Sequence, residues 1–89
     1  MARPIYTYTI YTSEPAYPPA NKTIVCENVA VNGYIIENAR NAARDAMGKL
    51  ARGEIVHESH ARGNQIFADV FKDGACVDKL ERIALLYPA

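Results

Sequence analysis

The residue types most able to do chemistry gather in His57-Glu58-Ser59-His60, which holds both histidines of this 89-residue chain. A zinc-protease helix needs two histidines four residues apart with a glutamate directly after the first, whereas these two are three apart. We expect this segment to be a strand, where His57 and His60 point to opposite faces and cannot bind one metal ion. The spacing therefore predicts no metal site.

The two cysteines, Cys26 and Cys76, are the other nucleophile candidates. A nucleophilic cysteine needs a neighbouring base, and a histidine could serve Cys26 only if their strands were neighbours. Nothing in the sequence orients such a base, and free cysteine is a common core residue. We expect buried free thiols, with a disulfide as the alternative, and neither catalysis nor a cofactor.

Basic side chains gather between residues 40 and 52, where Asp45 is the only acid; they are Arg40, Arg44, Lys49 and Arg52. Arg40 and Arg44 are four residues apart, so on a helix they are neighbours that could clamp a phosphate or a carboxylate. Lys plus Arg equals Asp plus Glu at 10 each, so no net charge steers the chain toward nucleic acid. Three interpretations stay open: an inert solvated face, contact with an acidic protein, and nucleic-acid binding.

One predicted helix, from Tyr34 to Arg52, must position these basic side chains. Apolar residues recur there in the three- and four-residue steps of one helix face, at Ile36, Ala39, Ala43, Ala46, Met47 and Leu50. Small alanine side chains allow the helix axis to lie close to a sheet. We therefore expect this face to be buried against strands.

The ends of this helix have local signals of their own. Asn32-Gly33 marks the start, with Asn32 able to accept from the first free amides, and Gly53 marks the end. Asn32-Gly33 is also a strong hairpin signal, in which case the helix begins near Asn38. We favour the longer helix, because the alternative leaves almost no connection between strand and helix.

The remaining segments predict strands. Ile5 to Thr12 is wholly β-branched and aromatic, and Thr23 to Val31 follows a Pro-rich surface loop over 13–22. After the helix we expect strands at Glu54–Ala61 and Gln65–Lys72, joined by a hairpin loop at Arg62-Gly63-Asn64. Asp73-Gly74 then makes a tight turn into Ala75-Cys76-Val77. The chain from Asp78 to Leu86 continues as a strand, with a helix as the alternative.

The chain is thus expected to be a single α+β domain over residues 1–89, with one helix packed on a small antiparallel sheet in the order ββαβββ. The strands look apolar on both faces: Tyr6, Tyr8 and Ile10 alternate with Ile5, Thr7, Thr9 and Tyr11, and Ile66, Ala68 and Val70 alternate with Phe67 and Phe71. One helix covers only one face. Either a terminal segment folds back over the second face, or that face or an edge is an interface with another protein or a second copy.

Tyrosine offers a large amphipathic contact area, so the six tyrosines favour an interface. We expect the contact residues to include Tyr6, Tyr8, Tyr11 and Tyr17 besides the basic helix face. No apolar run could span a membrane, and the N-terminal segment lacks a secretory pattern, which predicts a cytoplasmic protein without membrane contact.

An 89-residue chain with leading strands, the Ala/Arg helix NARNAARDAM and a closing hairpin on FKDG resembles the small orphan proteins of phages and mobile elements, anti-CRISPR proteins among them. The resemblance implies stoichiometric binding to a bacterial nuclease or surveillance complex and steric block without catalysis. Our expectation is therefore a non-enzymatic protein-binding module, with a homodimer as one form it could take. The alternative is a small nucleic-acid-binding regulator that uses the basic helix face.

Overall fold

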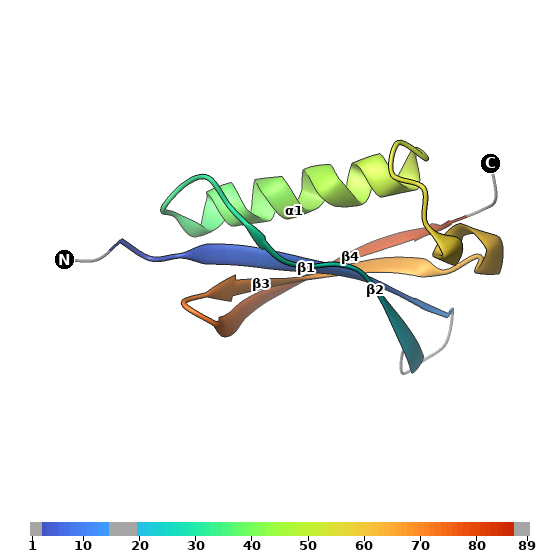
Figure 1. Cartoon of the computed structure of the whole chain (residues 1–89), viewed down its shortest axis with the longest axis horizontal. Coiled ribbons are helices and arrows are strands. Elements are labelled where there is room, and N and C mark those ends of the chain that lie inside the picture. The colour runs from blue at the N-terminus through green and yellow to red at the C-terminus, as the bar shows by residue number, and fades with distance from the viewer. Residues whose placement is uncertain (1–2, 15–19, 87–89) are drawn as a thin grey trace.

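One helix packs on one face of a four-stranded antiparallel sheet in the computed structural model, which describes residues 3–14 and 20–86 without the side chains at 20 and 82–85 (Figure 1). The elements are β1 (Tyr6–Glu14), β2 (Ala20–Ala30), α1 (Ile36–Ala51), the 3-10 helix η1 (Glu58–Arg62), β3 (Gln65–Lys72) and β4 (Ala75–Leu85). This confirms the predicted α+β class. Within the described part of the chain, neither helix has the length and hydropathy that a transmembrane span requires.

The sheet is built around β1, in the order β2-β1-β3-β4. β1 and β3 pair without interruption from Tyr6 opposite Lys72 to Ser13 opposite Gln65. The pairing of β1 with β2 shifts register three times, and Asn28 adopts a left-handed φ of 51° on that irregular strand. The β-branched and aromatic run of β1 therefore occupies the regular centre of the sheet, and the irregularities lie toward its edges.

The helix lies close to the sheet because its buried face is small. Ala39 and Ala43 are fully buried, and Met47 and Leu50 pack beside them against β1 and β3. The strand residues of this core are those expected on one face: Tyr6, Ile10, Ile66, Ala68 and Val70. Leu86, just after β4, joins the same helix-side core.

The start of α1 differs from the expected capping. Ile35 is the N-cap residue and supplies no side-chain hydrogen bond, so Asn32 as the cap is wrong. The side chain of Asn38 instead accepts from the Ile35 amide at 3.3 Å, which occupies one of the free N–H groups at the helix start. The longer helix is the better prediction, and Gly53 follows its end with a left-handed φ of 77° as expected.

The expected strand at Glu54–Ala61 is wrong, because its second half forms η1. The ring Nδ1 of His57 accepts from the Ser59 amide at 3.2 Å, a local cap that starts the 3-10 turn. Gly63 ends it with a left-handed φ of 64°. The segment 62–64 therefore links η1 to β3 and is not a hairpin loop.

The last hairpin is as predicted. Asp73 and Gly74 both have positive φ, 49° and 86°, and form the two-residue turn between β3 and β4. β4 continues to Leu85, which confirms the strand interpretation of the tail. β2 begins at Ala20, earlier than expected, and the part of the Pro-rich loop at 15–19, Tyr17 included, lies outside the described residues.

Candidate protein-binding surface

Arg40 is committed to holding α1 onto β4. Its Nε donates to Asp78 Oδ2 at 2.6 Å, and its Nη1 bonds Glu37 one helical turn earlier. The hydrogen bond from the guanidinium holds the pKa of the Asp78 carboxyl below its ordinary value. Arg40 is therefore occupied by internal partners and is not half of a free two-arginine clamp.

The other basic residues of the helix face are mostly neutralised by exposed ion pairs. Lys49 lies 3.3 Å from Asp45, the pair that the spacing predicts, and Arg52 lies 2.6 Å from Glu54. Arg44 differs, because it is exposed and forms no ion pair with any described residue. Of the four basic residues on this face, Arg44 therefore keeps its charge available to a ligand.

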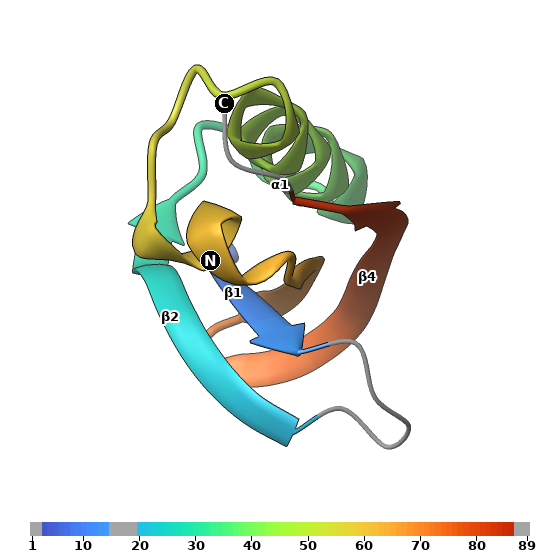
Figure 2. The ribbon, with the colours of Figure 1, turned by 90° about the vertical axis from the view of Figure 1, so that its right-hand side faces the viewer.

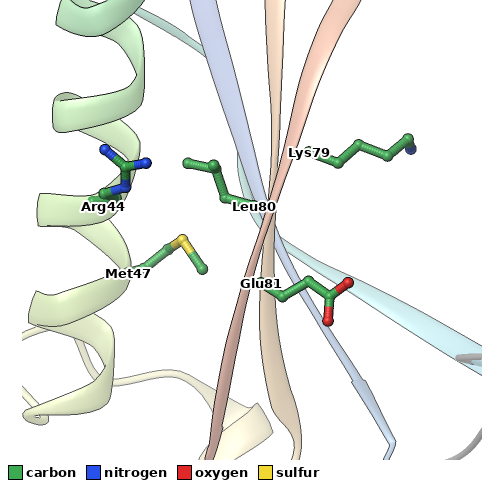
Figure 3. Close-up of a pocket in the computed structure, with 5 residues that line it drawn as sticks. All are labelled: Arg44, Met47, Lys79, Leu80 and Glu81. Atoms are coloured by element: carbon green, nitrogen blue, oxygen red, sulfur yellow. The ribbon is translucent and has the colours of Figure 1, made fainter.

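Arg44 lines a shallow hollow of about 410 Å³ between α1 and β4, together with Met47, Lys79, Leu80 and Glu81. Figure 3 shows Arg44, Met47 and Leu80 converging from helix and strand, while Lys79 and Glu81 point away from the helix. The hollow therefore has an apolar floor and one cationic side chain.

The four tyrosines expected to make contacts have different positions. Tyr6 is buried in the core and Tyr8 is half-buried against it, so both serve the helix-side packing. Burial raises the pKa of the Tyr8 hydroxyl. Tyr11 lies on the opposite face, and Tyr17 lies outside the described residues. Of Tyr6, Tyr8 and Tyr11, only Tyr11 belongs to the sheet face that α1 leaves uncovered.

The uncovered sheet face is centred on a ring stack. Tyr11 and Phe67, neighbours on β1 and β3, lie with centroids 5.4 Å apart and are each only 8% exposed. Lys22 places its ammonium 4.6 Å from the Tyr11 centroid. Burial, then the charge of Asp69, raises the pKa of the Tyr11 hydroxyl. Figure 2 shows α1 on the other side of the sheet. This face is thus apolar at its centre, but its aromatic rings are largely shielded.

The histidine segment forms a structural hydrogen-bond cluster. Ser59 is fully buried, and its hydroxyl lies 2.9 Å from His57 Nδ1 and also bonds the Thr12 hydroxyl. His60 Nε2 lies 2.9 Å from the Leu50 carbonyl oxygen, which ties η1 to the end of α1. A buried serine cannot attack an external substrate. These side chains explain the local fold, and the segment holds no accessible nucleophile beside a base.

Cys26 and Cys76 are both free, as expected. Cys26 is half-buried beside the core, but Cys76 is exposed, so its expected burial is wrong. Cys76 lies near the start of β4, where the register of the edge strand shifts and no described element covers it. Among the described residues, no three His, Cys, Asp or Glu side chains cluster as metal ligands.

A group of exposed apolar residues lies at the end of the molecule where α1 begins. Ile5 is 68% exposed, Tyr34 55% and Ile35 60%. The guanidinium of Arg3 lies 4.4 Å from the Tyr34 ring centroid. Figure 1 shows the start of β1, the loop before α1 and the β3–β4 turn at this same end. We call Arg3, Ile5, Tyr34 and Ile35 the end patch.

Hydrogen bonds of the backbone and of the Asp73 side chain hold the end patch in place. The Ile5 amide donates to Asp73 Oδ1 at 2.9 Å, and the Asp73 amide donates to the Ile5 carbonyl at 2.8 Å. The Val31 amide donates to the Tyr6 carbonyl at 3.1 Å, which fastens the loop before α1 to β1. The patch is therefore positioned by the β3–β4 turn and by the start of β1, with its apolar side chains left in solvent.

Sequence reasoning did not identify the end patch. The available signal is the run Tyr34-Ile35-Ile36, because three successive apolar residues at a helix start cannot all face one core. Only Ile36 packs against the core, and the two before it are exposed.

Comparison with known proteins does not assign this chain to a family, because no family model, no curated protein and no solved structure matches it.

Proposed function

We propose that this protein is a non-enzymatic protein-binding module whose end patch contacts the partner. Single exposed apolar residues are ordinary on protein surfaces, whereas several together mark interaction sites. Here Tyr34 and two isoleucines stand exposed at one end. Tyrosine and arginine are enriched among the residues that dominate binding energy, and Tyr34 is paired with Arg3. This exposed group is the observation that carries the proposal.

The positions of the chemical groups support binding over catalysis. The nearest approach to a nucleophile and base, Ser59 with His57, is buried and bonded to Thr12. The internal ion pairs of the helix face support a protein partner over nucleic acid, because a phosphate-binding surface requires several available cations. Arg44 alone does not provide such a surface.

We further propose that the partner is a bacterial defence complex such as CRISPR-Cas, and that the protein acts in the cytoplasm by steric block. The support is the resemblance in layout to the small inhibitors of phages and mobile elements. A rigid end patch on an 89-residue domain suits such a role, since a small inhibitor needs only one well-positioned contact surface to obstruct a larger complex.

The test is phage infection of bacterial strains that each carry one active CRISPR-Cas type. We expect the wild-type protein to restore plaque formation in at least one strain. The double variant Tyr34→Ala/Ile35→Asp should lose this effect while keeping its fold. The matched control is Val56→Asp, which alters an 86% exposed residue in the loop after α1, at the opposite end of the helix.

Failure of the wild type in every strain would contradict the choice of defence complex. Equal activity of the wild type and the Tyr34→Ala/Ile35→Asp variant would contradict the end patch as the contact surface. Loss of activity in Val56→Asp alone would place the contact at the other end of the molecule.

A further inference from the structure

β4 is an edge strand, and within the described residues nothing pairs with its outer side. It is 11 residues long, which is long for an unpaired edge. A free edge presents a row of backbone donors and acceptors that can accept another strand. Soluble proteins commonly prevent such pairing with charges or bulges, so the charges along β4 decide what this edge can accept.

The regular part of β4 is the five-residue run from Asp78 to Arg82. It pairs with β3 without a register shift, from Val70 opposite Asp78 to Ile66 opposite Arg82, and irregularities lie on both sides of it. The run reads acid, base, leucine, acid, base. Lys79 and Glu81 point away from α1, while Leu80 points toward it (Figure 3).

We infer that β4 pairs antiparallel with β4 of a second copy of the chain, with Leu80 at the two-fold axis. In this register Lys79 of each copy lies opposite Glu81 of the other, and these residues share the sheet face away from the helix. Lys79 and Glu81 of each copy therefore both meet an opposite charge, the arrangement that stabilises cross-strand pairs.

Charge selects this register over its neighbours. A two-fold axis between antiparallel strands places one residue directly opposite its own copy, because opposed side chains must share a face. An axis at Asp78, Lys79 or Glu81 would place two like charges directly against each other, which is destabilising. Leu80 is the uncharged residue at the centre of the run. Only a two-fold axis at Leu80 makes the flanking pairs attractive.

The fold accommodates such a dimer. Antiparallel pairing about an axis perpendicular to the sheet joins the two sheets at β4 and places both helices on the same side. The hollow between α1 and β4, floored by Met47 and Leu80, then lies beside the axis and faces the second copy. The end patch stays free, so this inference is independent of the function proposed above.

Analytical ultracentrifugation of the wild-type chain over a wide concentration range tests this dimer. We expect a reversible monomer–dimer equilibrium. Lys79→Glu alone and Glu81→Lys alone each turn two attractive pairs into repulsive ones, so each should raise the dimer dissociation constant by about tenfold or more. Lys72→Glu, which makes the same charge change near the β3–β4 turn, should leave the dimer unchanged.

The decisive sample is an equimolar mixture of the Lys79→Glu and Glu81→Lys chains. In a mixed dimer every opposed pair is again acid with base, so the mixture should associate about as tightly as the wild type. A mixture that associates no better than either variant alone overturns the register. A wild-type chain that is monomeric throughout overturns the dimer. Circular dichroism monitors the fold of each variant. The Lys79 ammonium lies 3.5 Å from Asp69, so Lys79→Glu places two acids together. If that variant unfolds, the dissociation constant of Glu81→Lys still decides the outcome.

Discussion

Arg40 and Arg44 are separated by one helical turn, yet they serve different purposes. Arg40 reaches across to Asp78 and joins helix to sheet, whereas Arg44 stays exposed beside the hollow. Their spacing alone could not distinguish these outcomes, because the distinction depends on which acid of β4 comes near each side chain. The basic helix face is thus a set of internal contacts with one remaining free arginine among its described residues.

The Arg40–Asp78 contact predicts an acid dependence of stability. The folded-state pKa of Asp78 is lowered below its ordinary value of 3.8, so the stabilisation is fully present above that value and is lost as pH falls through the folded-state pKa. Asp78→Asn should therefore lower the melting temperature slightly at neutral pH, and its difference from the wild type should shrink below about pH 4. Thermal unfolding measured from neutral to acidic pH checks this; a difference that grows in acid would contradict it.

Arg44 allows a test of the nucleic-acid alternative. We expect Arg44→Glu to change the unfolding free energy by less than about 0.5 kcal/mol, since the residue is exposed and unpaired among the described side chains. The wild type should bind single- or double-stranded nucleic acid no better than this variant in fluorescence anisotropy at low salt. Binding that is abolished by Arg44→Glu and falls steeply with added salt would instead support the nucleic-acid regulator.

At the scale of the elements, those with strong hydrophobic periodicity could be predicted from the sequence, whereas the one stabilised by local side-chain hydrogen bonds could not. The alanine face of α1, β1, β3 and the Asp73-Gly74 turn follow from patterns that packing reinforces. The segment 54–61 was expected to be a strand, but hydrogen bonds of His57 and Ser59 to nearby groups stabilise a 3-10 turn in its second half. Strand order was not readable, because it depends on pairings between distant segments.

The entry into α1 predicts a large effect of Gly33→Ala. Gly33 has a φ of 148°, and an added Cβ would lie 2.3 Å from Asn38 Oδ1, the atom that accepts from the Ile35 amide. We expect a loss of about 1–3 kcal/mol in unfolding free energy. Gly53→Ala is the matched control, because Gly53 also has positive φ but has open space around it, and its cost should be about 1 kcal/mol. Equal costs measured by chemical denaturation would show that the Asn38 contact is unimportant.

At the scale of the whole molecule, the binding features are separated in space. The end patch lies where α1 begins (Figure 1), and β4 runs along one side of the sheet (Figure 2). The sequence predicted an interface from the two-sided apolar strands, but Tyr11 and Phe67 are largely shielded on the uncovered face. Three of the seven exposed large apolar residues lie instead where a helix start and a strand start meet, and sequence alone cannot bring these together. A dimer through β4 would carry two end patches.

Site-specific photo-crosslinking in the natural host can locate the surface that contacts the partner, whichever protein that partner is. A photoreactive phenylalanine analogue replaces Tyr34 in one chain and Val56 in another, both exposed residues at opposite ends of α1. We predict one discrete adduct with a different protein from position 34 and none from position 56. The same adducts from both positions, or none from position 34, would contradict the end patch as the surface through which this protein acts.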